Sequence, residues 1–201
     1  QPRFGFKSRG LGDVYKRQVS AIAGRIPKKV DAMTPQHLSN SLWAAATLKD
    51  VAPEVLTAVP ALAGRVPDLV EDMVPQAVSN SLWAAATLRD VAPEVLKAVP
   101  DLAGRVPDVA EDMIPQALSN SLWAAASLKD EAPEVLKAVP VLVLEISWEL
   151  QDLQTQGLRM SLWAAAELNE NRLRDDLSAL SSKCECCCKL LRLVTSCTQG
   201  N

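Results

Sequence analysis

Between residues 34 and 50 the chain sorts apolar and polar side chains onto different faces of a single helix. The apolar positions recur at spacings of three and four residues, which gives the broad apolar surface of an α-helix buried on more than one side. They are Leu38, Leu42, Ala45 and Leu48. Thr34 can cap this helix and Pro35 fits its first position, so we expect a helix from 35 to about 49.

The remaining face of the same helix is polar except for one tryptophan. Its members lie at positions i, i+4, i+7, i+11 and i+14, a spacing that places them in one row. They are Gln36, Asn40, Trp43, Thr47 and Asp50. Three consecutive alanines at 44 to 46 lie beside this row, and their small side chains let neighbouring helices approach closely.

The next segment, 51–73, carries prolines that interrupt a helix. Pro53 can begin a helix, whereas Pro60 and Pro67 each remove a backbone donor and clash with the preceding turn. We therefore expect a bent helix, or one broken into two or three pieces. Since no stretch alternates apolar and polar residues with the period of a strand, the predicted fold class is all-α.

Both segments recur together every forty residues. Residues 61–100 and 101–140 are identical at 32 of 40 positions, 21–60 aligns with them without a gap, and 141–180 keeps the length and the LWAAA core. Because one helical pair cannot enclose its apolar face, such repeats stack and bury one another. We predict an αα-superhelix (α-solenoid) of four repeats, 21–60, 61–100, 101–140 and 141–180, the last a degenerate cap.

Charge is distributed unevenly along the chain. Residues 21–180 carry thirteen basic and twenty-two acidic side chains, whereas residues 1–20 carry five and one. The repeat array is therefore acidic, which disfavours strong phosphate binding. Two carboxylate clusters are interpreted as a solvated face near a helix end. They are Asp68, Glu71 and Asp72, and their copies Asp108, Glu111 and Asp112.

The first residues fall outside the repeat pattern. Their GLGDVYKRQ segment closely resembles a translated sequencing-adapter read-through, and the chain does not begin with Met. We expect residues 1–20 to be a non-native or disordered segment, with a basic disordered arm as the alternative reading. No targeting signal is visible, and a genuine one could have been lost with the true start.

All five cysteines lie in the tail, 181–201. Cys184 and Cys187 have the C-x-x-C spacing of zinc sites, but tetrahedral closure needs two further ligands. The adjacent cysteines cannot readily supply them, and the single histidine, His37, lies in the first repeat. We predict no metal site and expect a disordered or non-native tail; palmitoylation is a weaker alternative.

Two interpretations of the polar row remain open. In the first, Asn and Gln amides bind base edges and the indole stacks on a base, one nucleotide per repeat. In the second, the tryptophans are structural anchors that pack between repeats, and the asparagines form a buried ladder beside them. The residues alone favour the second, because the rows scarcely vary and the array is acidic. The anchors are Trp43, Trp83, Trp123 and Trp163.

A family resemblance favours the first interpretation. TPQHLSNSLWAAATL, VPQAVSNSLWAAATL and IPQALSNSLWAAASL resemble the PQ-x-LSN-x-LWA-x-A-x-L helix of octotricopeptide-repeat proteins, and are similar to the leucine-rich helical repeats of FAST-kinase-like and RAP-domain proteins. The resemblance covers 21–180. It implies a right-handed superhelix that binds single-stranded RNA in mitochondria or chloroplasts and supports RNA processing, stability or translation. The long period, the near identity of the repeats and the lack of a RAP-like domain in this sequence depart from the family pattern.

Under the RNA interpretation the candidate ligands are the amides and hydroxyls of the rows. They are Gln36, Asn40, Thr47, Gln76, Asn80, Thr87, Gln116, Asn120 and Ser127. The alternative is a protein-binding scaffold whose acidic concave surface takes a basic partner and binds no nucleic acid. An organellar location rests on the resemblance alone, with the cytoplasm as the alternative.

Neither catalysis nor a cofactor is expected. The sequence has one histidine, no metal quartet, no nucleophile elbow and no phosphate-cradling loop, so no catalytic residue can be named. The FAST-kinase-like similarity does not imply a kinase, because the Gly-rich loop, HRD and DFG motifs are absent. No run of 18 apolar residues occurs either, so no membrane span is expected.

Overall fold

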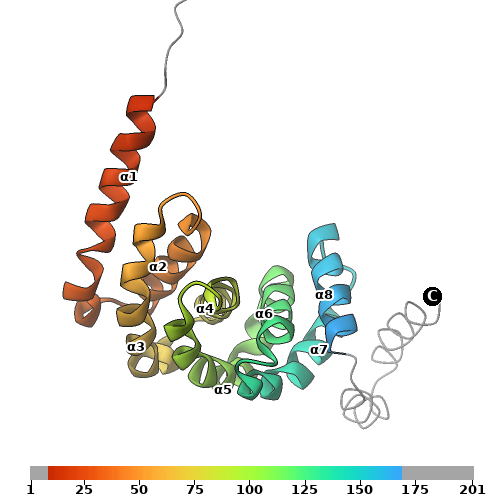
Figure 1. The fold of residues 1–201 in the computed structure, drawn as a ribbon. Helices are drawn as coiled ribbons and strands as arrows, with labels where there is room; N and C mark the ends of the chain where they lie inside the picture. The colour runs from red at the N-terminus through yellow and green to blue at the C-terminus, as the bar shows by residue number, and fades with distance from the viewer. Residues whose placement is uncertain (1–8, 169–201) are drawn as a thin grey trace, which may run out of the picture.

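The structure of the chain, a computed structural model, describes residues 9–168 and is an all-α helical-repeat solenoid, which confirms the predicted class. No strand occurs in that range. Figure 1 shows two rows of helices that follow one arc, with α1 (Arg9–Ala23) projecting from one end. The inner row holds the stacking helices α2 (Pro35–Leu48), α4 (Pro75–Leu88), α6 (Pro115–Leu128) and α8 (Thr155–Glu167). The outer row holds α3 (Val59–Leu69), α5 (Val99–Val109) and α7 (Val139–Trp148).

The stacking helices begin at a proline in three of the four cases. Thr34 caps α2 as predicted, because its Oγ1 accepts a hydrogen bond from the backbone N–H of His37 at 3.3 Å. In α4 and α6 the residue before the proline is apolar and extended, and offers no side-chain cap. The α2 helix ends at Leu48, whose carbonyl accepts the backbone N–H of Ala52 at 2.8 Å.

The proline-rich segments are broken into three pieces, as the sequence predicts. After α2 come a 3₁₀ helix, the α-helix α3 and a second 3₁₀ turn. Neither Pro60 nor Pro67 interrupts α3, contrary to expectation: Pro60 lies in its first turn, where a missing N–H costs nothing, and Pro67 lies inside it, two residues before its end. The 3₁₀ pieces are η3 (Pro53–Ala58), η4 (Val70–Asp72), η5 (Pro93–Ala98), η6 (Ala110–Asp112) and η7 (Pro133–Ala138).

One continuous core lies between the two rows of helices. Leu82, Leu102 and Val106 are fully buried, and Ala84, Ala85 and Ala86 of α4 are at most 2% exposed. Each stacking helix packs directly on the next, α2 on α4, α4 on α6 and α6 on α8. Helices thus approach α4 from several sides at once, and its three consecutive alanines leave room for them.

The end of α1 belongs to the solenoid. Residues 19–33 match 59–73 in sequence, and the end of α1 with η1 (Ile26–Lys28) and η2 (Val30–Ala32) repeats the arrangement of α3 and η4. Residues 9–20, expected to form a non-native or disordered segment, are helical and form most of α1, and only its last part, from Val19, matches an outer-row helix in sequence. Residues 1–8 and 169–201, which include the end of the fourth predicted repeat and the cysteine tail, lie outside the described residues.

Candidate functional site

Each central stacking helix reaches solvent along one narrow strip. The residues of α4 that are exposed or half-buried are Pro75, Gln76, Asn80, Trp83 and Thr87. Those of α6 are Pro115, Gln116, Asn120, Trp123 and Ser127. All the remaining residues of both helices are buried by neighbouring helices. The row predicted from spacing is thus the surface that α4 and α6 offer to a ligand.

The four row tryptophans differ in exposure along the array. Trp43 and Trp163 are 46% and 44% exposed, whereas Trp83 and Trp123 are half-buried and pack against the core. The rings of Trp123 and Trp163, from adjacent repeats, are 6.3 Å apart and tilted by 39°. Full burial of Trp83 between repeats is therefore not observed. The Trp83 indole lies at the edge of the interface between successive stacking helices, which we call a joint, so that only part of the ring is covered.

The row asparagines do not form a buried ladder. Asn40 is exposed, and Asn80 and Asn120 are half-buried. Within residues 9–168 none of these three amides makes a hydrogen bond to protein, so the expected bond from Asn80 to the indole is not found. The exposed Gln36, Gln76 and Gln116 lie one turn earlier in the same rows. Their amides leave donors and acceptors free for a ligand.

Two of the three row hydroxyls are already engaged. Thr47 donates to the carbonyl of Trp43 at 2.9 Å, and Thr87 donates to that of Trp83 at 2.8 Å. Each threonine therefore has acceptor capacity left but no free donor. Thr47 is exposed, and Thr87 and Ser127 are half-buried. Thr47 and Thr87 are thus poorer ligands than the amides.

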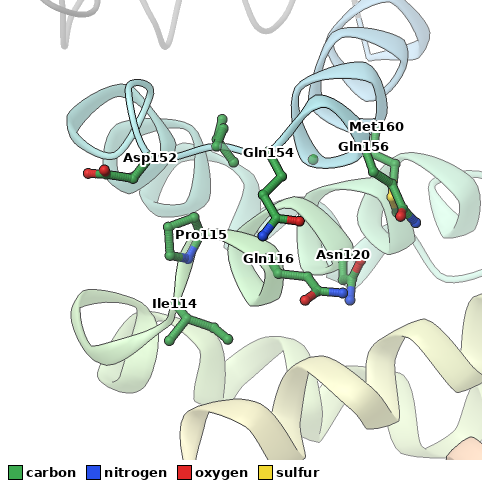
Figure 2. A pocket seen from close by; sticks show the side chains of 10 residues that line it. Ile114, Pro115, Gln116, Asn120, Asp152, Gln154, Gln156 and Met160 are labelled. Atoms are coloured by element: carbon green, nitrogen blue, oxygen red, sulfur yellow. The ribbon is translucent and has the colours of Figure 1, made fainter.

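Grooves lined by amides open between successive stacking helices. The groove between α2 and α4 has a volume of about 540 Å³ and is lined by Gln36, Asn40, Gln76 and Asn80. The groove between α6 and α8 is smaller, about 170 Å³. Figure 2 shows Gln116, Asn120, Gln154 and Gln156 turned toward the same space in this second groove, with Met160 where other repeats have asparagine. We call these two spaces the amide grooves.

The surroundings of the rows are neutral or acidic. Asp72 lines the first amide groove and Asp152 the second. At the far end of the rows the cations are paired with carboxylates. The pairs are Lys49–Asp50 at 3.4 Å, Arg89–Glu131 at 3.5 Å, Arg89–Asp90 at 3.7 Å and Lys129–Glu167 at 3.2 Å. A ligand on the rows therefore meets amides, indoles and carboxylates before it meets a cation.

Buried serines that sequence reasoning overlooked fix the register of the joints. The hydroxyl of Ser79 donates to the carbonyl of Ala117 in the next helix at 2.9 Å, and that of Ser161 donates to Oγ of Ser119 at 3.3 Å. All three serines are at most 6% exposed. The signal was present in the repeated SNS triplet, where serine flanks the row asparagine on both sides.

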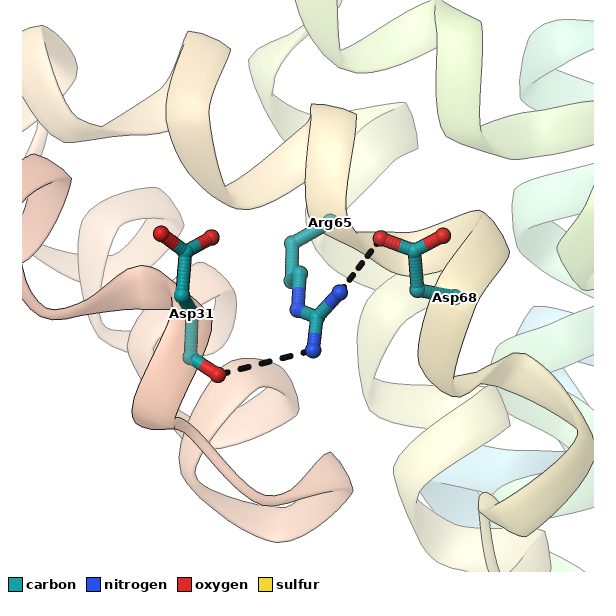
Figure 3. Close-up of polar contacts among 3 residues, drawn as sticks. All are labelled: Asp31, Arg65 and Asp68. Carbon is teal, nitrogen blue, oxygen red and sulfur yellow. Dashed lines mark hydrogen bonds and ion pairs between the residues drawn. The ribbon is translucent and has the colours of Figure 1, made fainter.

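On the outer side, arginines join consecutive repeats. Figure 3 shows Arg65 of α3 paired with Asp68 and reaching the backbone carbonyl of Asp31 in the preceding repeat, at 3.5 Å. Arg105 of α5 repeats this arrangement with Asp108 at 3.2 Å and Glu71 at 3.7 Å. The carboxylate clusters are exposed, as the sequence predicts, but Glu71 also bridges two repeats.

The third such position is reversed in charge. Glu145 of α7 occupies the place of Arg65 and Arg105. Burial raises the pKa of its carboxyl above the ordinary 4.5, and the neighbouring Glu111 and Glu149 raise it further. A raised pKa means that the folded chain holds this proton more tightly than the unfolded chain. The ionised Glu145 carboxylate therefore destabilises the folded chain. This effect is absent below pH 4.5 and becomes complete as pH rises through the pKa of the folded state.

Replacing Glu145 by arginine should stabilise the chain by about 0.5 to 1 kcal/mol at neutral pH, because it removes the repulsion and restores a pair with Glu111. Urea unfolding at pH 4 and pH 7 checks this, and the advantage over the parent should be larger at pH 7. Glu145→Gln, which removes the charge without offering a cation, should give an intermediate result. Equal stability of parent and Glu145→Arg at pH 7 would contradict the argument.

No protein-family model, curated protein or solved structure matches this chain. The likeness to octotricopeptide repeats therefore stays a prediction that rests on the residues of the stacking helices. Among residues 9–168, no group of three or more His, Cys, Asp or Glu side chains could hold a metal ion, and the Cys184–Cys187 motif lies outside them. In the same range no helix has the length and apolar character needed to cross a bilayer.

Proposed function

We propose that this solenoid binds single-stranded RNA along the inner row of helices and acts in RNA processing, stability or translation, in mitochondria or chloroplasts if it follows the family it resembles. The observation that supports the proposal is the composition of the exposed strip. On the central helices that strip includes an exposed glutamine, a half-buried asparagine and one indole per repeat. Unpaired nucleobases are recognised by hydrogen bonds to their edges and by stacking on aromatic faces.

The charge of the surface dictates how such an RNA would lie. Asp72 and Asp152 line the amide grooves and would repel phosphates. Bases must therefore point toward the rows while the backbone stays toward solvent. Because the cations beside the rows are already paired, few counterions are released on binding. We expect the logarithm of the affinity to fall with the logarithm of salt concentration with a slope of about 1 or less in magnitude.

Nearly identical rows also limit selectivity. Gln36, Gln76 and Gln116 share one position, as do Asn40, Asn80 and Asn120. Three successive repeats with identical base-contacting residues cannot specify a mixed sequence, so we expect a preference for a run of one base. Asn and Gln amides match the N6 and N7 edge of adenine, which makes oligoadenylate the first RNA to test.

The carboxylates favour a second candidate, an acidic protein-binding scaffold that takes a basic partner. Asp72 and the row amides could hold the cationic side chains and backbone of an extended Lys- or Arg-rich segment. A cation can also lie over the exposed face of Trp43. Unlike bases, such a partner would gain from the negative charge of the array.

Asn80→Ala should weaken the binding of oligoadenylate by about 5-fold, because it removes one hydrogen bond worth about 1 kcal/mol. Fluorescence anisotropy with labelled RNA measures this, and a labelled Lys-rich peptide is run in parallel. The matched control is Gln18→Ala, since Gln18 is an exposed amide of α1 outside the rows. Peptide binding that depends on Asn80, with no RNA binding at low salt, would replace the RNA proposal by the scaffold.

A further inference from the structure

Two indoles from successive stacking helices lie close together at one joint. The ring centroids of Trp123 in α6 and Trp163 in α8 are 6.3 Å apart, and the ring planes are tilted by 39°. Within residues 9–168, neither Trp43 nor Trp83 makes such a ring contact. The joint between α6 and α8 therefore carries an aromatic ring on each side, which the other two joints do not bring together.

The two rings differ in how firmly they are held. Trp123 is half-buried and packs against the core, whereas Trp163 is 44% exposed. A flat group between two parallel rings needs about 3.5 Å on each side, so the ring planes must be about 7 Å apart. The observed centroid separation falls short of that by less than about 1 Å. A small rotation of the exposed Trp163 ring, parallel to the fixed ring of Trp123, therefore opens a space of this width.

Hydrogen-bonding groups are scarcer beside these two rings than beside the other row tryptophans. One turn before the rings, α6 carries Asn120, but α8 carries Met160 where the other stacking helices have asparagine (Figure 2). A thioether is only a weak hydrogen-bond acceptor, but it is polarisable and packs well on aromatic rings. The other amides of this groove lie a further turn or more from the rings, namely Gln116, Gln154 and Gln156. A ligand here meets more aromatic surface on its faces and fewer polar groups at its edge.

We propose that Trp123 and Trp163 form a slot that holds one unpaired base of the bound RNA between their indoles, by its faces and largely without regard to its identity. The inference rests on the proposed RNA binding and adds to it a site of a second kind. Stacking on an aromatic ring tolerates any base, because every base has a π-face, whereas amides recognise a base by its edge. The array then selects a run of one base along its first rows and accepts any base at the slot.

A guanidinium from a protein partner would be the other flat occupant of the slot. Glu167, the carboxylate one turn after Trp163, is already paired with Lys129 at 3.2 Å, so it adds little attraction for a cation. Taking a cation out of water without a carboxylate partner costs more than taking out a neutral base. The slot therefore suits a base better than a cation.

The first test separates contacts with the face of a base from contacts with its edge. Fluorescence anisotropy compares oligoadenylate with versions that carry an abasic nucleotide or a guanosine at each position in turn. At the amide rows both changes should weaken binding, because both remove the adenine edge. At the slot the abasic change should weaken binding by about 5-fold or more, whereas guanosine should change it by less than about 2-fold. If every position that rejects the abasic nucleotide also rejects guanosine, the slot is wrong.

The second test assigns the tolerant position to the two rings. Trp163→Ala should weaken the binding of intact oligoadenylate by about 5-fold or more. The same change should weaken the binding of RNA that is abasic at the slot by less than about 2-fold, because the base is already missing. Trp163→Phe keeps an aromatic face and should recover most of the binding. The matched control is Trp148→Ala, since Trp148 is 59% exposed in α7, outside the rows, and should leave binding unchanged.

The outcomes separate the slot from the RNA binding on which it rests. If no oligoadenylate binds at low salt, both are overturned. Equal RNA binding by the parent and a correctly folded Trp163→Ala variant, as checked by circular dichroism, removes the slot and leaves RNA binding in place. An Arg-rich peptide that loses affinity in Trp163→Ala, while RNA does not, assigns the two rings to a protein partner and likewise overturns the slot.

Discussion

Replacing Leu82 by alanine should lower the free energy of unfolding by about 3 to 5 kcal/mol, near the top of the range for buried leucines. Leu82 is 0% exposed and lies in the middle of α4, with stacking helices on both sides. The cavity cannot collapse easily, because the neighbouring alanines hold the helix backbones at a fixed short distance. Urea unfolding followed by far-ultraviolet circular dichroism measures the loss.

A matched control is Val91→Ala. Val91 is 48% exposed in the turn after α4, so its truncation should change stability by about 0.5 kcal/mol or less. The shape of the Leu82→Ala transition is also informative. In a solenoid each repeat contacts only its neighbours, so weakening a central repeat should broaden or split the unfolding curve. A cost equal to that of Val91→Ala would show that α4 is not the centre of the core.

The elements that could be predicted from the sequence are those fixed by local spacing. The start of α2 at Pro35 follows from a cap and a proline side by side, and the start of η3 at Pro53 follows from that proline. The polar row follows from helical period alone. None of these needs knowledge of a neighbouring repeat, and the internal repetition then supplies the stacking.

The features that could not be predicted depend on how two repeats approach. Whether Asn80 is covered is decided by the distance between α2, α4 and α6, which no single helix encodes. The same holds for the Ser79 hydroxyl, which bonds a carbonyl 38 positions away, and for Arg65, which reaches 34 positions back. The arginine recurs with the sequence repeat, but only the way the repeats stack brings it to Asp31.

Position along the array also changes what one residue type does. Trp43 and Trp83 occupy the same place in their helices, yet one is 46% exposed and the other is half-buried. The sequence presents them as equivalent, and only the stacking distinguishes them. Because of that difference, the contribution of the indole to stability can be measured apart from any contribution to binding.

Trp83→Ala should therefore cost about 1.5 to 3 kcal/mol in stability, less than the 3 to 5 kcal/mol typical of an enclosed tryptophan. Part of the ring already faces solvent, and only the packed part is lost. Trp43→Ala should cost about 1 kcal/mol or less, because its ring has less core to leave. Urea unfolding of both variants compares the two costs directly, and equal costs would show that stacking does not decide how far the ring is covered.

Affinity for RNA should not follow the same order. If a base stacks on each indole, both substitutions should weaken oligoadenylate binding by a similar amount, about 1 to 3 kcal/mol. Trp83→Phe is the matched control, since it keeps an aromatic face and should recover most of the binding while remaining less stable than the parent. Anisotropy measured where each variant is fully folded keeps the two effects apart. Unchanged RNA affinity in Trp43→Ala, the variant with the most exposed ring, would remove the indoles from the binding surface and leave them as packing residues only.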